Sequence, residues 1–120
     1  MHGLESHEYL EQLLGRGPPR EAGLPQLPAV SVIYFTARWC GACKRLDLAA
    51  LEAAFPALDW LKCDVDANQY SPGFCGVRSI PTFMLIVRGK AVGPFTSSDT
   101  QKVAGWLQAQ LEGAGLLSAA

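Results

Sequence analysis

An apolar segment at residues 30–36, Val-Ser-Val-Ile-Tyr-Phe-Thr, constrains the fold more than any other part of the chain. Only Ser31 interrupts it, so the segment lacks the alternation of apolar and polar residues that marks a strand with one solvated face. A strand buried on both faces has this continuous pattern. The segment therefore predicts the central strand of a sheet that is covered on both sides.

Two cysteines follow this segment closely. Cys40 and Cys43 enclose Gly41 and Ala42, and Trp39 stands directly before them. In a chain that looks cytosolic, a Cys-x-x-Cys pair indicates redox chemistry or metal binding. The pair is therefore the first candidate functional site.

A helix is expected directly after the first cysteine. Residues 43–55 are rich in helix formers, and Pro56 ends the pattern. This places Cys40 at a helix N-terminus, where unpaired N–H groups and the macrodipole favour the negative thiolate, the reactive form of cysteine. Cys43 lies one turn on, so its S–H can point back at the Cys40 sulfur, and the same closeness allows a disulfide.

Length, charge and composition exclude several classes of function. A chain of 120 residues suffices for one domain with a core, and its net charge of −1 gives no reason to expect nucleic acid or an anionic membrane as a partner. No apolar run approaches the roughly 20 residues of a membrane span, and the first residues show no signal-peptide pattern. Four cysteines are too few for a disulfide-stapled secreted scaffold. We therefore expect a cytoplasmic protein.

The N-terminal segment has the signature of a short capped helix followed by a loop. Ser6 can cap a helix over residues 7–14. Its apolar face would consist of Tyr9, Leu10, Leu13 and Leu14. Four of the eight prolines fall in residues 15–29, which we therefore expect to form a loop.

Downstream, strand signatures alternate with helical ones. Residues 58–65 predict a strand, residues 67–76 an irregular segment with a short helical turn, and residues 82–87 and 91–96 a hairpin. A last helix, capped by Asp99 or Ser98, carries an apolar stripe. That stripe consists of Val103, Trp106, Leu107 and Leu111. This order predicts an α/β sandwich with a mixed sheet.

Three segments in this order, residues 35–44, 62–66 and 77–83, resemble the thioredoxin family. The resemblance runs from about residue 30 to about residue 111. It implies an α/β fold of the thioredoxin-like type, a three-layer sandwich with a central mixed β-sheet flanked by helices. The implied domain is 1–112, with residues 1–29 contributing the N-terminal helix and a proline-rich loop that is longer than typical, residues 30–112 the core, and residues 113–120 a flexible tail.

The resemblance also implies roles for individual residues. Cys40, exposed at the helix start, would be the nucleophile, and the more buried Cys43 would resolve the mixed disulfide. Trp39 would form a contact surface for the substrate. Pro81 would be cis and would place the Ile80 backbone opposite Cys40, ready to pair with an extended substrate. Neither a cofactor nor a metal is implied.

Four departures from the family pattern concern the same region. Ala42 replaces a proline, which implies a more oxidising potential. Tyr34 replaces a buried aspartate that is thought to accept the Cys43 proton, and a phenol is a poor base at pH 7. Lys62, the usual neighbour of that aspartate, would lack its carboxylate and is either a proton-relay member or a snorkelling strand lysine. The remaining departures are Thr36 in place of a tryptophan and Thr96 or Ser97 in place of a glycine.

Several further side chains near the motif have two possible interpretations. Four basic residues are either a positive rim around the site or scattered solvated charges: Arg38, Lys44, Arg45 and Arg78. Cys63, on an expected strand, is interpreted as an inert buried thiol. Cys75 is interpreted as either an ordinary thiol or a regulatory one.

The leading hypothesis for function is a protein-disulfide reductase. It would be recharged by a flavoprotein reductase of the thioredoxin reductase type and would pass electrons to disulfide-containing clients such as peroxiredoxins. One alternative is a more specialised or more oxidising exchange enzyme, indicated by Ala42 and Tyr34. The other is a non-catalytic binding module that uses the pair for metal, although Cys63 and Cys75 do not form the second Cys-x-x-Cys pair of a zinc site.

Overall fold

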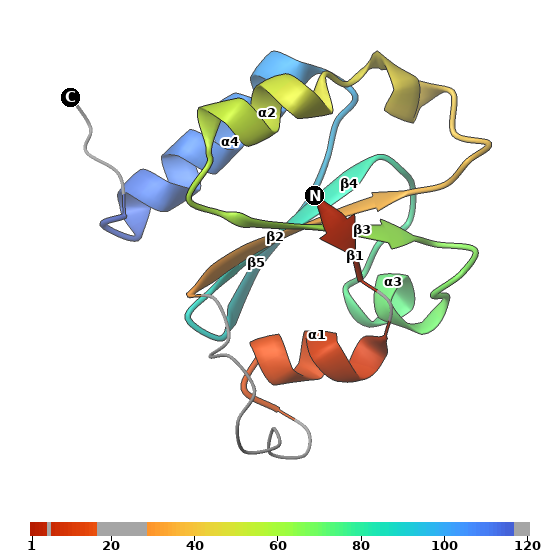
Figure 1. Cartoon of the computed structure of the whole chain (residues 1–120), viewed down its shortest axis with the longest axis horizontal. Helices are drawn as coiled ribbons and strands as arrows, with labels where there is room; N and C mark the ends of the chain where they lie inside the picture. The colour runs from red at the N-terminus through yellow and green to blue at the C-terminus, as the bar shows by residue number, and fades with distance from the viewer. Residues whose placement is uncertain (5, 17–28, 117–120) are drawn as a thin grey trace.

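The computed structural model describes residues 1–4, 6–16 and 29–116. A five-stranded mixed sheet forms its centre, with strand order β1-β3-β2-β4-β5 (Figure 1). The strands are β1 (His2–Gly3), β2 (Val30–Thr36), β3 (Asp59–Asp64), β4 (Thr82–Val87) and β5 (Lys90–Thr96). Helices α2 (Leu48–Ala54) and α4 (Thr100–Gly113) cover one face, and α1 (His7–Leu13) and α3 (Tyr70–Phe74) cover the other. The α/β three-layer sandwich expected from the sequence is confirmed.

Strand β2 is the central strand, as its apolar sequence predicts. It pairs in parallel with β3 and antiparallel with β4, so that Tyr34 stands between Lys62 and Phe83 in register. Its side chains alternate between the two hydrophobic layers: Val32 and Tyr34 pack beneath α2 and α4, whereas the intervening residues pack toward α1. Burial on both faces follows directly from this position.

Two predicted helix caps are present. The Ser6 hydroxyl accepts a hydrogen bond from the Tyr9 N–H at 3.3 Å and begins α1. The Asp99 carboxylate accepts hydrogen bonds from Gln101 N–H at 2.9 Å and Lys102 N–H at 3.2 Å and begins α4. Each cap satisfies backbone donors that the first helical turn leaves without a partner.

The continuous helix expected over residues 43–55 is wrong. A 3₁₀ helix, η1 (Ala42–Arg45), is followed by Leu46 in an extended conformation, and α2 begins anew after Asp47. The Asp47 side chain accepts a hydrogen bond from the Ala50 N–H at 3.0 Å, which makes this aspartate an N-cap in the middle of the expected helix. Cys40 therefore precedes a single short turn and lacks the macrodipole of a long α-helix.

Both ends of the chain differ from expectation. Strand β1 was not expected; it pairs in parallel with β3, and the amino group of Met1 contacts Glu52 at 3.0 Å. The expected tail from residue 113 begins too early, because Gly113 ends α4 and Leu116 packs on the core, with its N–H bonded to the Leu111 carbonyl at 2.8 Å. Residues 117–120 and most of the expected proline-rich loop, 17–28, lie outside the described residues.

In the described part, no helix combines the length and apolarity of a membrane span.

Candidate active site

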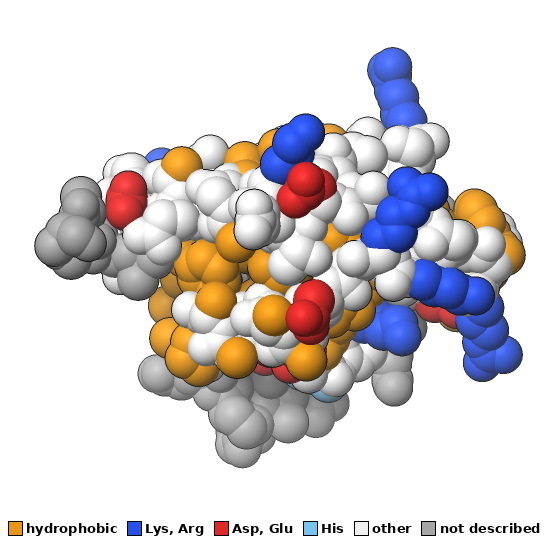
Figure 2. Space-filling model, turned by 90° about the horizontal axis from the view of Figure 1, so that it is seen from above, with side chains coloured by type: hydrophobic (Ala, Val, Ile, Leu, Met, Phe, Trp, Pro, Cys, Tyr) orange, Lys and Arg blue, Asp and Glu red, His pale blue; other side chains and the backbone are white. Residues whose placement is uncertain are grey.

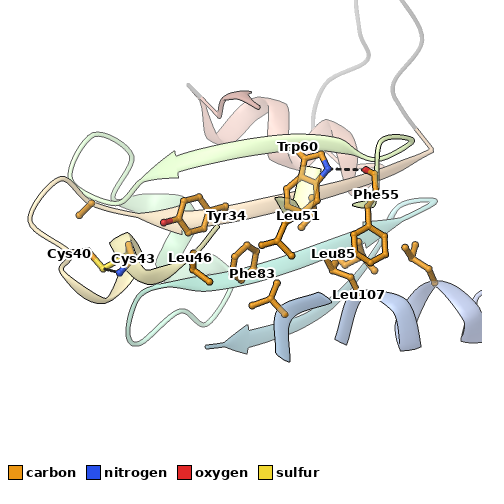
Figure 3. Packing of buried hydrophobic residues seen from close by; sticks show 14 residues of the cluster. Tyr34, Cys40, Cys43, Leu46, Leu51, Phe55, Trp60, Phe83, Leu85 and Leu107 are labelled. Carbon is orange, nitrogen blue, oxygen red and sulfur yellow. Dashed lines mark hydrogen bonds between the residues drawn. A yellow bond between two sulfur atoms is a disulfide. The ribbon is translucent and has the colours of Figure 1, made fainter. Parts of the chain in front are cut away.

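Cys40 and Cys43 are joined by a disulfide, with their Cα atoms 5.4 Å apart (Figure 3). The turn that joins β2 to η1 produces this geometry: Gly41 adopts right-handed helical angles, and Lys44 N–H bonds to the Gly41 carbonyl at 3.2 Å. Within the turn, the Cys43 N–H donates to the Cys40 sulfur at 3.1 Å. The turn thus directs a backbone donor at the sulfur that was predicted to carry the negative charge.

Both cysteines are buried, which corrects the expected contrast between them. Cys40 is 4% exposed and Cys43 is 6% exposed, so the first cysteine is not the exposed one and the second is not the more buried. The reason is that the short turn of η1 lies against the sheet and both residues join the core layer that contains Tyr34 and Leu46 (Figure 3).

Trp39 forms the exposed side of the site. Its side chain is 67% exposed, and its indole N–H donates to the Asp66 carboxylate at 2.8 Å. This hydrogen bond links the turn after β2 to the turn after β3 and holds the ring beside a groove of about 430 Å³. The groove is lined by Trp39, Val65, Pro72, Val77, Arg78, Ser79 and Ile80.

The groove residue Ile80 directly precedes the expected cis-proline. The Ile80–Pro81 peptide bond is cis, as predicted. Thr82 anchors this loop, because its hydroxyl donates to the Ser79 carbonyl at 2.6 Å and also lies 2.6 Å from the Thr96 hydroxyl on β5. Trp39, the residue before Cys40, and Ile80 thus line one groove, whereas the pairing of the Ile80 backbone with a substrate stays a prediction.

Tyr34 lies in the core on the same side of the sheet as the disulfide. It is 2% exposed and stacks on Phe83 with 5.1 Å between ring centroids (Figure 3). Burial raises the pKa of its phenol, and a hydrogen bond with the Thr36 side chain opposes this only in part. Because the phenol stays protonated near neutral pH, it does not accept a proton from Cys43.

Lys62 lies beside Tyr34 in the sheet but is exposed. It lines an open hollow of about 200 Å³ together with Thr36, Ala37, Arg38 and Asp64. An exposed amine at the strand surface matches the snorkelling interpretation better than a buried proton relay. Ala42, the first residue of η1, packs partly against the core, and Gly41 faces open space.

The two other cysteines do not belong to this site. Cys63 is fully buried, and desolvation together with the nearby Cys75 and Asp64 raises the pKa of its thiol to about 12. Burial raises the pKa of the Cys75 thiol to about 11. Both thiols are therefore almost fully protonated at neutral pH, as expected of an inert Cys63. Among the described residues, no cluster of three or more His, Cys, Asp or Glu side chains could hold a metal ion.

Some residues of the site were not assigned a role from the sequence. Asp66 lies in the segment that carried the family resemblance, but its bond to Trp39 spans 27 positions and depends on the fold. The groove residues Val65, Pro72 and Val77 have ordinary apolar side chains and come from the turn after β3, from α3 and from the loop after α3. Their spacing in the sequence contains no signal for a shared surface.

Comparisons with known proteins agree with this geometry. The family model named Thioredoxin matches residues 24–109. The mitochondrial thioredoxin-3 of Saccharomyces cerevisiae is 41% identical over 64 residues, which cover 52% of this chain and 50% of the yeast protein. Human thioredoxin is 32% identical over 74 residues, which cover 60% of this chain and 70% of the human one.

A solved structure of Trypanosoma brucei brucei thioredoxin superposes with a TM-score of 0.75 at 23% identity, over 93% of this chain and 90% of that one. The Fasciola hepatica thioredoxin structure has 30% identity and a TM-score of 0.63, over 68% of this chain and 81% of that one. The family model alone spans well over half of the chain. The chain belongs to the thioredoxin family of thiol–disulfide oxidoreductases, and Cys40 and Cys43 occupy the active-site position of that family.

Proposed function

We propose that this protein reduces disulfides in other proteins by dithiol–disulfide exchange, with Cys40 as the nucleophile and Cys43 as the resolving thiol. The observation that carries the proposal is the Cys40–Cys43 disulfide directly after Trp39, an exposed tryptophan that lines a groove. The backbone N–H of Cys43, 3.1 Å from the Cys40 sulfur, supports a thiolate at Cys40 in the reduced protein.

The exchange proceeds in two balanced steps. The Cys40 thiolate attacks one sulfur of the client disulfide, a mixed disulfide forms, and the other client sulfur leaves as a thiolate. Cys43 then loses its proton and attacks the Cys40 sulfur, which releases the second client thiolate and closes the Cys40–Cys43 disulfide. The client gains two electrons and, after protonation, two protons. An external two-electron donor must then reduce the Cys40–Cys43 pair.

The partners and the compartment extend the same proposal. We expect a flavoprotein reductase as the donor and peroxiredoxins among the clients. One structural neighbour, at 24% identity, comes from work on thiol resolution in a yeast mitochondrial 1-Cys peroxiredoxin via glutathione/thioredoxin systems. Roles in electron transport and cell redox homeostasis would follow from such clients. We place this activity in the cytoplasm, because unpaired thiols such as Cys63 and Cys75 suit a reducing compartment.

The two alternatives considered from the sequence are not favoured. A non-catalytic module would not need a bonded cysteine pair, and family membership supports exchange chemistry. A specialised, more oxidising enzyme is indicated only by Ala42 and Tyr34. The potential of the Cys40–Cys43 pair measured against glutathione tests it, since a value near the thioredoxin example of about −270 mV counts against specialisation.

Reduction of insulin disulfides with dithiothreitol as the donor tests the proposed function. The wild-type protein should accelerate the reaction, whereas Cys40→Ser should stay at the rate without protein. Cys43→Ser should instead accumulate a mixed disulfide at Cys40, which mass spectrometry detects. A wild-type rate no higher than that of Cys40→Ser would refute the proposal.

A further inference from the structure

Basic side chains gather at the end of the molecule that carries the disulfide. Figure 2 shows Lys and Arg side chains crowded toward the right-hand end of that view, where η1 and the turn after β2 lie in Figure 1. We define the basic rim as the four exposed basic residues of the turn after β2, of η1 and of the loop before Pro81: Arg38, Lys44, Arg45 and Arg78. The chain as a whole has a net charge of −1, so this concentration is local.

The basic rim is not neutralised within the described part of the chain. The Met1 amino group pairs with Glu52 there, the His2 and His7 imidazoles lie against Asp59 and Glu11, and none of these contacts includes a rim residue. Asp66, which follows the groove residue Val65 in the chain, already accepts the Trp39 indole N–H. The rim cations are therefore available to an incoming partner.

Arg78 connects the basic rim to the groove. Among the described residues that line the groove, it alone carries a charge, and apart from Ser79 the other lining side chains are apolar or aromatic. A guanidinium can bind a carboxylate through two parallel N–H···O bonds, a geometry that other side chains do not offer. The groove thus combines an apolar floor with one directional site for an anion.

We propose that the preferred clients carry acidic residues next to the target disulfide, with Arg78 binding a client carboxylate and the rest of the basic rim attracting the acidic segment. This inference rests on the proposed function and names its substrate class. Single exposed ion pairs contribute little to affinity, but a cluster of like charges accelerates encounter with an oppositely charged partner. The preference should therefore be largest at low ionic strength, because the Debye length shrinks from about 30 Å at 0.01 M to about 3 Å at 1 M salt.

Three disulfide-linked peptides test this inference. They differ only at the positions flanking cysteine, which carry Asp, Asn or Lys. The kcat/KM for each is measured at about 0.01 M and 0.5 M salt and divided by its rate with dithiothreitol, which corrects for differences in intrinsic disulfide reactivity. We expect the Asp peptide to exceed the Asn peptide about fivefold at low salt, with the Lys peptide slowest. At 0.5 M salt the three values should agree within about twofold.

Variants then separate Arg78 from general charge. Arg78→Gln should reduce the Asp-to-Asn ratio at low salt to about twofold or less, and Arg78→Lys should retain part of it. Lys90→Gln removes an exposed lysine from the β4–β5 hairpin, far from η1 in Figure 1, and should leave the ratio unchanged. Circular dichroism confirms folding of each variant.

The outcomes distinguish this inference from the proposed function. If the wild-type protein reduces insulin and the Asn peptide but shows no preference for Asp, or a preference that salt does not weaken, the acidic-client inference is wrong and the function stands. An Arg78→Gln variant with an unchanged ratio contradicts the role of Arg78. Failure to reduce insulin or any peptide overturns the proposed function itself.

Discussion

Replacing Tyr34 by aspartate should accelerate resolution of the mixed disulfide. Tyr34 is buried on the side of the sheet that holds the disulfide, and its phenol is protonated near pH 7 because burial raises its pKa. Cys43 must lose a proton before it attacks Cys40. A carboxylate at position 34 introduces a base in place of the protonated phenol.

The size of the gain has a limit. A thiol with a pKa of about 8.5 is about 3% ionised at pH 7, so complete deprotonation of Cys43 raises the resolution rate by at most about 30-fold. The cost in stability is also substantial. Loss of a fully packed aromatic ring typically costs about 3–5 kcal/mol, and the stack on Phe83 at 5.1 Å is lost with it. Because the free energy of unfolding of a domain of this size is only about 5–15 kcal/mol, the variant should be assayed at low temperature.

Tyr34→Asn is the matched control, since it leaves the same cavity without the base. Tyr34→Phe removes only the hydroxyl and should resolve at the wild-type rate. Stopped-flow measurement of single-turnover insulin reduction at pH 7 follows the step directly. The reasoning is refuted if Tyr34→Asp is no faster than Tyr34→Asn, or if Tyr34→Phe loses most of the activity.

Three further predictions concern other parts of the molecule. Because the folded protein keeps the Cys63 proton up to a pKa of about 12, and the unfolded chain releases it above about 9, the free energy of unfolding should fall as pH rises from 9 to 12. Urea denaturation at pH 8 and pH 10.5 measures this fall in the free energy of unfolding, which Cys63→Val should lessen. A fall of equal size in the wild-type protein and in Cys63→Val would contradict the role of the Cys63 thiol. Asp66→Ala should raise the KM for insulin by about two- to fivefold because Trp39 loses its acceptor, whereas Asp66→Asn keeps an acceptor oxygen and should stay near wild type. His7→Ala should lower the free energy of unfolding by about 1–3 kcal/mol, because the imidazole Nδ1 lies 2.9 Å from the Ser71 hydroxyl and the ring packs edge-on against two aromatic rings of α3. A double-mutant cycle with Ser71→Ala should show coupling between the two residues, and additive effects would argue against the bond.

The parts of the fold that could be predicted depend on local chemistry. The β2 segment lacks polar alternation because both of its faces are covered, and Ser6 caps α1 through a local hydrogen bond to the Tyr9 N–H. The interruption at Asp47 also has a local cause, an N-cap, but the helix-forming residues on either side of it obscured the signal. Strand β1 is only two residues long and exists through its pairing with β3, so no local pattern marks it.

In the candidate site, too, local features could be predicted from the sequence, whereas features that depend on the fold could not. The Cys40–Cys43 spacing is a local feature, so the sequence alone marks the pair as a candidate site. The cis peptide bond before Pro81 is confirmed, but it was expected from the family resemblance and not from the local residues. The burial of Cys40 was missed because it depends on how η1 lies against the sheet. The bond from Trp39 to Asp66 joins two turns that only the folded sheet brings together.

We propose that in the reduced protein the turn before η1 holds the Cys40 sulfur as a reactive thiolate within bonding reach of Cys43. The rate of iodoacetamide labelling of reduced Cys43→Ser across a pH series measures it most directly, since this variant keeps the backbone N–H that donates to Cys40. The other two thiols stay protonated in the neutral range, with pKa values of about 12 and about 11. We predict a midpoint for Cys40 clearly below the ordinary thiol value of about 8.5. A midpoint at or above that value would contradict the account.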